Sequence, residues 1–419
     1  ELALRHLSEV RNFDSPAYGV AQTVSRLICE DRLKELCEFA FPYDFAMEPL
    51  EVYHVRQALA FYQKRQDLEI GVDREAVAWE KFSSTEAKCR ETNQVFKAWD
   101  RGEFQFFRDV DQVFHLAQRK ISKVLGPVPR LSDLKFRFGP GATTNVRRKI
   151  ASPRNKLAAA FACSEDLIPV VQQVLEEMPA WSLGECYYSL GDSPAVVSVE
   201  LHHGKLSFVP KSALTYRSVV TEPPLNGICQ LAVGDYMTRQ LSASGLDLRS
   251  QERNQALARS GSITGALATL DLSSASDLNA IEPVYHLLPL DWAAFLAKFR
   301  TGKVMYRGRE ITLQKFSTMG NGYTFPLESM IFWAIASCAT KVATDESWRW
   351  VQDNVGVYGD DIIVPTEAVD LTVRALTALG HTVNSTKSFA SGPFRESCGK
   401  DYFRGIDVRP VYIKDRLSG

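Results

Sequence analysis

The sequence predicts an α+β fold, on three observations. Apolar residues recur at helical spacing from residue 18 to about 125. Short β runs dominate 186–221 and 381–413, and strands and helices do not alternate regularly as they would in a doubly wound sheet. The 419 residues are enough for two or three packed subdomains.

Residues 1–130 form the predicted helical region. Val110, Val113 and Phe114 show the 3.6-residue spacing of a buried helical face. The Gly-Pro-Val-Pro run at 126–129 ends this region, because Gly and Pro interrupt helices.

Residues 131–265 mix turns, strands and one long helix. A turn-rich stretch covers 138–142, and the runs 195–199 and 206–209 predict a hairpin across a His-His-Gly turn. A helix opened by a proline is expected over 224–243. Five cations with no acid among them follow the turn-rich stretch: Arg147, Arg148, Lys149, Arg154 and Lys156.

The remaining elements are short. A strand is expected over 266–270, a helix from Thr324 to about Val342, and a tight hairpin over 354–365. A helix over 366–380 follows, and then the short strands of 381–413.

Charge and composition exclude several classes of protein. There are 49 Lys and Arg against 50 Asp and Glu, a formal net charge of −1, so a uniformly basic nucleic-acid binder is excluded. The same net charge does not exclude a protein that gathers its positive charge in one channel. No apolar run approaches the ~20 residues of a membrane helix. The cysteines are scattered and His residues are not clustered, which argues against a zinc site or a disulfide framework.

Two adjacent carboxylates, Asp360 and Asp361, follow Tyr358 and Gly359 at the tip of the predicted hairpin. Between apolar strands these carboxylates repel each other and lose solvation, and a divalent cation relieves both costs. The alternative is an ordinary polar turn, for which Gly-Asp is a common choice.

A third carboxylate, Asp271, ends the strand predicted at 266–270. Aspartates from separate strands that bridge two cations ~3.5–4 Å apart suit in-line phosphoryl or nucleotidyl transfer. Asp277, six residues later, has a competing interpretation as the N-cap of the following segment.

Two further elements contribute polar groups. The loop before the helix at Thr324 holds Gly320, Asn321 and Gly322: its glycines permit close approach of a template or nucleotide, and its amide can read a hydroxyl. A generic helix-entry turn is the alternative. Lys211 and Arg217 suit triphosphate oxygens, although solvated surface charge also explains such residues.

Four ordered motifs resemble those of the replicase subunits of the small positive-strand RNA bacteriophages, the leviviruses, which include coliphage Q-beta. The motifs occupy 271–277, 317–322, 358–361 and 392–399. The resemblance is dense from about 205 to 413 and thin before residue 200.

This resemblance implies a right-hand fold of fingers, palm and thumb. The implied regions are a helical N-terminal or fingers region at 1–130, fingers with basic nucleotide-binding strands at 131–265, a palm with the metal site at 266–390, and a palm–thumb loop with the start of the thumb at 391–419. Family chains continue further into a helical thumb, so a truncated thumb is expected.

The resemblance also implies roles for particular residues. Asp271, Asp360 and Asp361 become catalytic metal ligands, and Lys387 can protonate pyrophosphate. The implied nucleotide-binding residues are Lys211, Arg217, Ser276, Asp277 and Asn321. Template and loop positions are Gly320, Gly322, Tyr358 and Gly359.

The implied activity is RNA-directed RNA polymerase, that is, template-directed RNA synthesis in phage genome replication by two-metal nucleotidyl transfer. Two Mg²⁺ ions are the expected cofactors, with Mn²⁺ a possible substitute. The implied partners are RNA template and product, ribonucleoside triphosphates, host elongation factors Tu and Ts and a host ribosomal protein, in the host bacterial cytoplasm and away from membranes.

Three other functions are weighed against this one. A reverse transcriptase usually has a residue other than Gly before the paired Asp. A non-catalytic RNA-binding palm would have lost Asp271 or Asp360. A metal-dependent phosphohydrolase would show mixed His and Asp ligands.

For the first 125 residues, fingers, a host-factor platform or both remain open. Basic charge is expected to follow 147–156, Lys205, Lys211 and Arg217.

Overall fold

A four-stranded antiparallel sheet forms the centre of the molecule, in a computed structural model that describes residues 1–179, 181 and 197–415. Its strand order is β10-β5-β9-β8. The bounds are β5 Leu267–Ser273, β8 Gly356–Tyr358, β9 Asp361–Pro365 and β10 Thr382–Val383. Strand β5 extends beyond the predicted end at residue 270, and the predicted hairpin at 354–365 is confirmed as β8 and β9.

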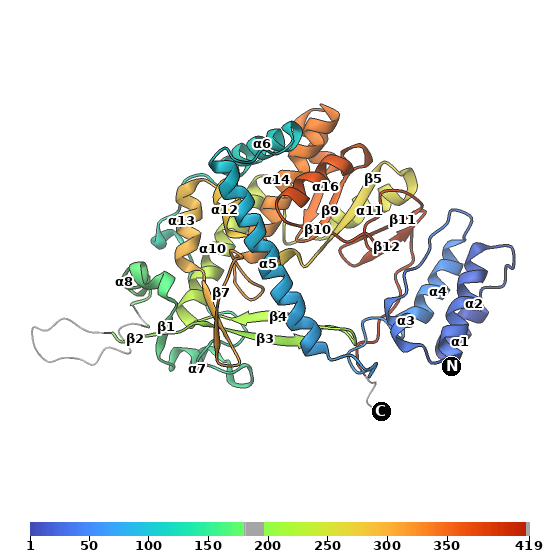
Figure 1. The fold of residues 1–419 in the computed structure, drawn as a ribbon, viewed down its shortest axis with the longest axis horizontal. Coiled ribbons are helices and arrows are strands. Elements are labelled where there is room, and N and C mark those ends of the chain that lie inside the picture. The colour runs from blue at the N-terminus through green and yellow to red at the C-terminus, as the bar shows by residue number, and fades with distance from the viewer. Residues whose placement is uncertain (180, 182–196, 416–419) are drawn as a thin grey trace, which may run out of the picture.

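Helices cover both faces of this central sheet. The buried side chains of Ile362 and Val364 belong to the main core, whereas Ile363 between them packs with Ala258 on the other face. This alternation follows from strand geometry, in which successive side chains point to opposite faces. The helices concerned are α6 Arg108–Leu125, α11 Glu252–Thr264, α14 Thr324–Thr344 and α16 Val369–Ala378. Helices α14, α16 and α6 lie together, and α11 lies on the opposite side (Figure 1).

A second four-stranded sheet has the order β4-β3-β6-β7. Its bounds are β3 Gly204–Pro210, β4 Tyr216–Thr221, β6 Lys303–Tyr306 and β7 Arg309–Thr312. The predicted pairing of 195–199 with 206–209 is wrong for the described residues. Strand β2 Val199–Leu201 instead runs parallel to β1 Phe161–Cys163, and residues 206–209 of β3 pair with β4. Residues 195 and 196 lie outside the described residues.

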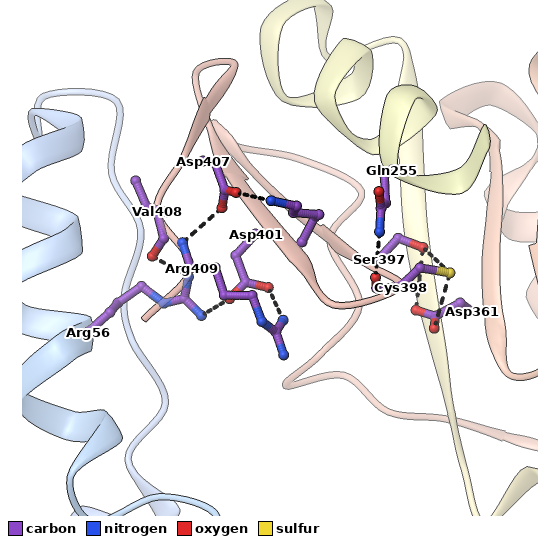
Figure 2. A network of polar contacts seen from close by, with 10 residues as sticks. Arg56, Gln255, Asp361, Ser397, Cys398, Asp401, Asp407, Val408 and Arg409 are labelled. Atoms are coloured by element: carbon purple, nitrogen blue, oxygen red, sulfur yellow. Dashed lines mark hydrogen bonds and ion pairs between the residues drawn. The ribbon is translucent and has the colours of Figure 1, made fainter. Parts of the chain in front are cut away.

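The N-terminal helices α1–α4 form a lobe that packs on the last strands of the chain (Figure 1). The lobe comprises α1 Leu2–Ser8, α2 Pro16–Cys29, α3 Leu33–Glu38 and α4 Pro49–Ala60. The strands are β11 Phe394–Ser397, β12 Lys400–Phe403 and β13 Ile406–Asp407. A buried ion pair joins the two parts: Arg56 Nη2 lies 2.7 Å from Asp401 Oδ2, and Arg409 also contacts Asp401 (Figure 2).

Helix α5 Arg74–Asp100 crosses the front of the molecule from the second sheet toward α6 (Figure 1). Its N-cap residue is Asp73, whose side chain accepts hydrogen bonds from two backbone amides of the first turn. Phe96 of α5 joins the main core, whereas α1–α4 belong to a separate one. The predicted region 1–130 is helical: α1–α4 share one core, whereas α5 joins the main core through Phe96 and smaller clusters through Phe82 and Cys89.

The remaining elements connect these parts. The α-helices are α7 Pro153–Leu157, α8 Val171–Glu176, α10 Pro224–Ala243, α12 Ile281–Leu287, α13 Leu290–Phe299 and α15 Trp348–Asn354. The 3₁₀ helices are η1 Leu131–Asp133, η2 Arg148–Ile150, η3 Glu165–Val170, η4 Ala275–Asp277 and η5 Thr366–Ala368. This mixture of helices and sheets confirms the predicted α+β class. Within the described part of the chain, no helix is long and apolar enough to cross a membrane.

Candidate active site

The Gly359-Asp360 turn between β8 and β9 lies against α14. Gly359 occupies the first central position with φ +58°, as a hairpin turn of type II′ requires of that position. Its amide donates to Ser329 Oγ at 3.0 Å, and an added Cβ would lie 2.9 Å from the Phe325 ring. Tyr358 packs edge-on against the same ring. The turn therefore holds Asp360 in a defined place at the end of the sheet.

Asp271 lies beside this turn because β5 pairs with β9. Asp271 and Asp361 are direct partners in the antiparallel register. The segment after β10 contacts Asp271 at two points. Asn384 Nδ2 donates to Asp271 Oδ2 at 3.2 Å, and the backbone amide of Asp271 donates to Ser388 Oγ at 3.0 Å. The sequence-predicted convergence of strand-end carboxylates is therefore present.

Asp361 faces a different neighbour from Asp360. Ser397 Oγ donates to Asp361 Oδ1 at 3.4 Å, and Cys398 Sγ lies 3.7 Å from Oδ2 (Figure 2). Asp271 and Asp360 line the site cavity, whereas Asp361 is not among its lining residues. The carboxylates converge, but only two of the three reach the open space.

Burial makes two of these carboxylates, Asp271 and Asp361, difficult to ionise. Desolvation raises the pKa of Asp271 to about 6, against the opposing effect of Lys387 and with a further contribution from Asp360. Desolvation, with the charge of Asp360 next, raises the pKa of Asp361 to about 7. The neighbouring side chains therefore do not fully compensate the negative charge of the ionised carboxylates, and a bound cation would neutralise it.

The cavity beside the carboxylates has a volume of about 450 Å³. Lys211, just after β3, and Arg217, in β4, line it, as do Ser276, Asp277 and Asn321. Lys387 is exposed and lines it too. Helix α5 contributes Ala78, Lys81 and Phe82, so the N-terminal third of the chain also forms part of the site.

A second cavity of about 680 Å³ adjoins the first, since Lys211, Arg217, Asp360 and Lys387 line both. Its other wall comes from α3, α4 and the segment after them. That wall adds Glu38, Arg56 and Lys64, whereas β11 contributes Glu396 and the segment after β13 contributes Lys414. Burial, followed by the charges of Lys81, Arg217 and Lys387, lowers the pKa of Lys211, as expected where cations are crowded together.

The residues predicted to check the ribose have specific partners. Asp277 ends η4, so the N-cap interpretation is wrong; Lys315 and Ser218 bind its carboxylate. Ser276 Oγ donates to Glu328 Oε2 at 2.8 Å. Asn321 is buried, and its side-chain oxygen accepts from the Tyr323 amide.

The glycines of the 317–324 loop permit packing within the protein. Gly320 has φ +116°, and an added Cβ would lie 2.1 Å from the Val220 carbonyl oxygen. A Cβ on Gly322 would lie 2.7 Å from the Leu231 amide nitrogen. Gly320 lines the cavity and Gly322 does not, so close approach to β4 and α10 explains both residues.

The predicted basic stretch at 147–156 is only partly available to a ligand. Arg147, Arg148, Lys149 and Arg154 are exposed. Lys156 is buried, and its ammonium group donates to the Gly139 carbonyl at 2.5 Å. The prediction that Lys156 lies on an exposed basic path is therefore wrong, because this buried side chain instead binds a main-chain carbonyl.

Sequence reasoning missed three polar residues of the site, of which Glu328 and Lys315 are buried and Asn384 is partly buried. Glu328 of α14 holds Ser276, Asn384 holds Asp271, and Lys315 holds Asp277. Burial raises the pKa of Glu328 to about 8, and the hydrogen bond from Ser276 opposes this. A charged residue inside the apolar α14 pattern was a signal for Glu328; nothing local marks Asn384 or Lys315.

The donor atoms of the site fit hard cations. Asp271 and Asp360 offer carboxylate oxygens, which Mg²⁺ and Mn²⁺ prefer. In the part of the chain that the structure describes, no three His, Cys, Asp or Glu side chains group closely enough to form a metal site by themselves. Mg²⁺ usually takes one or two protein carboxylates and completes its shell with water and substrate phosphates, so two carboxylates suffice.

Comparison with known proteins identifies the family. A family model described as RNA replicase, beta-chain, matches residues 44–419. The chain is 36% identical over 406 residues to the RNA-directed RNA polymerase subunit beta of Enterobacteria phage SP, covering 95% of this chain and 66% of that protein. The protein of the same name from Escherichia virus Qbeta is 35% identical over 91% of this chain and 62% of its own length.

Among solved structures, the RNA-dependent RNA polymerase of a human picobirnavirus is similar, with a TM-score of 0.44 and 13% identity over 96% of this chain and 72% of that one. The chain spans less than two thirds of the length of the two phage relatives. The match to the family model covers most of the sequence, and the chain therefore belongs to the RNA replicase beta-chain family.

Proposed function

We propose that this protein is an RNA-directed RNA polymerase that replicates a phage RNA genome. The observation that carries the proposal is the meeting of Asp271 and Asp360 in one cavity, opposite Lys211 and Arg217, in a chain of this family. The reaction is attack of a 3′-hydroxyl on the α-phosphate of an incoming ribonucleotide, directed by an RNA template.

The chain's own residues divide this work between them. Lys211 and Arg217 bind the triphosphate, because crowded cations at the cavity wall attract an anionic ligand. Ser276, Asp277 and Asn321 face the ribose. Lys387 borders both cavities and holds a proton for the departing pyrophosphate.

Asp271 and Asp360, with Asp361 beside them, would hold two Mg²⁺ ions, or Mn²⁺, which supply positive charge for the attacking hydroxyl and the leaving group. Burial supports this assignment, because it raises the pKa values of Asp271 and Asp361, and a bound cation would favour their ionised forms.

The same proposal assigns the domains, the partners and the cellular location. The central sheet serves as the palm, the second sheet and α5 as fingers, and the segment after Phe394 as the start of a thumb. The phage relatives are named subunit beta, which supports a replicase of several subunits. The proposed partners are RNA, ribonucleoside triphosphates, host elongation factors Tu and Ts and a host ribosomal protein, in the host bacterial cytoplasm.

The test is ribonucleotide incorporation on a single-stranded RNA template with Mg²⁺, for the parent and for Asp360→Asn. Removal of one ligand charge should lower the rate on the order of 10³-fold or more. Undiminished incorporation by the variant would refute the metal assignment. The assay includes the host factors, so that an inactive isolated subunit is not mistaken for a negative result.

A matched control is Asp345→Asn, which removes a carboxylate from the exposed end of α14, where Asp345 pairs with Lys341. Its activity should equal that of the parent. Selective incorporation of deoxyribonucleotides by the parent would indicate a reverse transcriptase instead.

A further inference from the structure

Lys315 is completely buried behind the nucleotide side of the cavity, with 0% of its side chain exposed. It lies between β7 and the 317–324 loop and is not among the residues that line the cavity. A buried ammonium group is costly unless charged partners surround it, so its contacts indicate what it does.

Two carboxylates from distant parts of the chain meet at this ammonium group. Lys315 Nζ lies 2.8 Å from Asp277 Oδ1 and 3.2 Å from Glu86 Oε1. It also lies 4.4 Å from the centre of the Phe82 ring, within the range of a cation–π contact. Burial lowers the pKa of Lys315, but the charges of Asp277 and Glu86 outweigh burial, so the pKa is raised and the group stays charged.

Glu86 is itself held in place. Its other oxygen, Oε2, accepts a 2.6 Å hydrogen bond from the Gln314 amide. Because Glu86 belongs to α5 and Gln314 immediately precedes Lys315, the helix and the loop are fixed to each other at this point. Lys315 therefore has a rigid anchor on the side away from the cavity.

Asp277 is the member of the cluster that reaches the cavity. Its Oδ1 is bound by Lys315, and its Oδ2 accepts from Ser218 Oγ at 3.1 Å. A carboxylate has about four acceptor positions, so each oxygen can still accept another hydrogen bond. With both oxygens already oriented, Asp277 can offer an acceptor to a ribose hydroxyl only in the directions that Lys315 and Ser218 leave free.

We propose that Lys315 is a positioning residue for discrimination between ribonucleotides and deoxyribonucleotides. By linking Asp277 to Glu86 of α5, it holds the carboxylate in the orientation that accepts a hydrogen bond from the 2′-hydroxyl. This inference rests on the proposed polymerase function. A site built to bind a hydroxyl rejects an analogue without it, and this rejection weakens when the acceptor is free to turn away.

A role in stability alone would have a different consequence. A loosened fold lowers incorporation of both nucleotide types equally and leaves their ratio unchanged. A displaced Asp277 penalises the ribonucleotide specifically, because the deoxyribonucleotide makes no bond to lose. The ratio of kcat/KM for ATP to kcat/KM for dATP separates these outcomes.

The experiment compares the parent with Lys315→Met, Asp277→Asn and the double variant, on an RNA template with Mg²⁺. Met keeps most of the buried volume and removes the charge. Lys315→Met should lower the ATP-to-dATP ratio on the order of 10-fold, mainly through a higher KM for ATP. In the Asp277→Asn background it should change the ratio by less than about 2-fold, because the two residues act through one contact.

Lys341→Met is the control, because it removes a lysine from a partly exposed pair at the end of α14 and should leave the ratio unchanged. If Lys315→Met does not fold, Glu86→Gln decides the question: it weakens the far anchor, and a ratio lowered on the order of 3-fold supports the proposal. An unchanged ratio in whichever variant folds, or equal effects of Lys315→Met with and without Asp277, overturns it. If the parent incorporates no ribonucleotide, the proposed function fails, which is a separate result.

Discussion

Asp271 and Asp361 face each other as the last residue pair of the β5–β9 ladder. Two carboxylates on one face of a sheet would ordinarily destabilise it, since like charges directly opposite repel. The turn adds Asp360 next to this pair. The repulsion is therefore concentrated where a cation would relieve it.

The three carboxylates should not be equally important for activity. Asp271→Asn and Asp360→Asn remove groups that line the cavity, and each should lower incorporation on the order of 10³-fold. Asp361→Asn should cost at least 10-fold less than either, because its oxygens face Ser397 and Cys398. Steady-state incorporation rates for the three variants check this order, and equal losses would contradict it.

Stability without metal should fall as pH rises. The pKa values of Asp271 (about 6) and Asp361 (about 7) lie above their ordinary value of 3.8. The folded state therefore binds more protons than the unfolded state, and this contribution, complete below pH ~4, is lost as pH rises through about 7. Thermal unfolding in EDTA should show a midpoint lower by a few degrees at pH 8 than at pH 5.

Mg²⁺ should reverse part of that loss, because it binds the ionised carboxylates of the folded state. The rise in midpoint on adding Mg²⁺ should be larger at pH 8 than at pH 5. A variant with both Asp271→Asn and Asp361→Asn should show a flatter pH dependence than the parent. The same slope in parent and variant would show that other groups cause it.

The N-terminal lobe should depend on its buried ion pair. Arg56→Met leaves Asp401, which is 0% exposed, with Arg409 as its remaining charged partner, and should destabilise the protein by about 3 kcal/mol. Arg404→Met is the matched control, because Arg404 pairs with Glu48 between the same two parts but at an exposed position. It should cost at most about 1 kcal/mol.

Denaturant titration measures both free energies of unfolding, and limited proteolysis between 60 and 74 detects release of the lobe. Similar losses for the two variants would mean that burial does not distinguish the two contacts.

Gly320 should tolerate a methyl group less well than Gly308. Both have positive φ, so Ala costs backbone strain of at least about 1 kcal/mol at either position. A Cβ at Gly308 meets nothing within 4 Å, whereas one at Gly320 meets the Val220 carbonyl oxygen at 2.1 Å. Gly320→Ala should therefore lose about 1–3 kcal/mol more, and also lose activity, because the loop lines the cavity. Thermal unfolding and incorporation assays on both variants test this difference.

Local sequence was sufficient for the elements whose causes are local. The helices at 224–243 and 324–344 follow from apolar periodicity with Pro near each start, and the β8–β9 hairpin follows from Gly359 between apolar runs. The three aspartates could be grouped as one candidate site because each lies at a strand end or turn, but only the fold shows that Asp271 and Asp360 line the cavity and Asp361 does not.

The pairing of the strands, and the residues that bind the predicted site residues, depended on tertiary structure. Strand β2 pairs with β1, and residues 206–209 pair with β4 instead of β2, which no turn residue shows. Lys156 looked like a surface cation but supports a carbonyl in the interior. Lys315, Asn384 and Glu328 received their roles only when distant elements enclosed them. Buried polar groups must find partners wherever the fold places them, so their importance depends on contacts that adjacent residues do not specify.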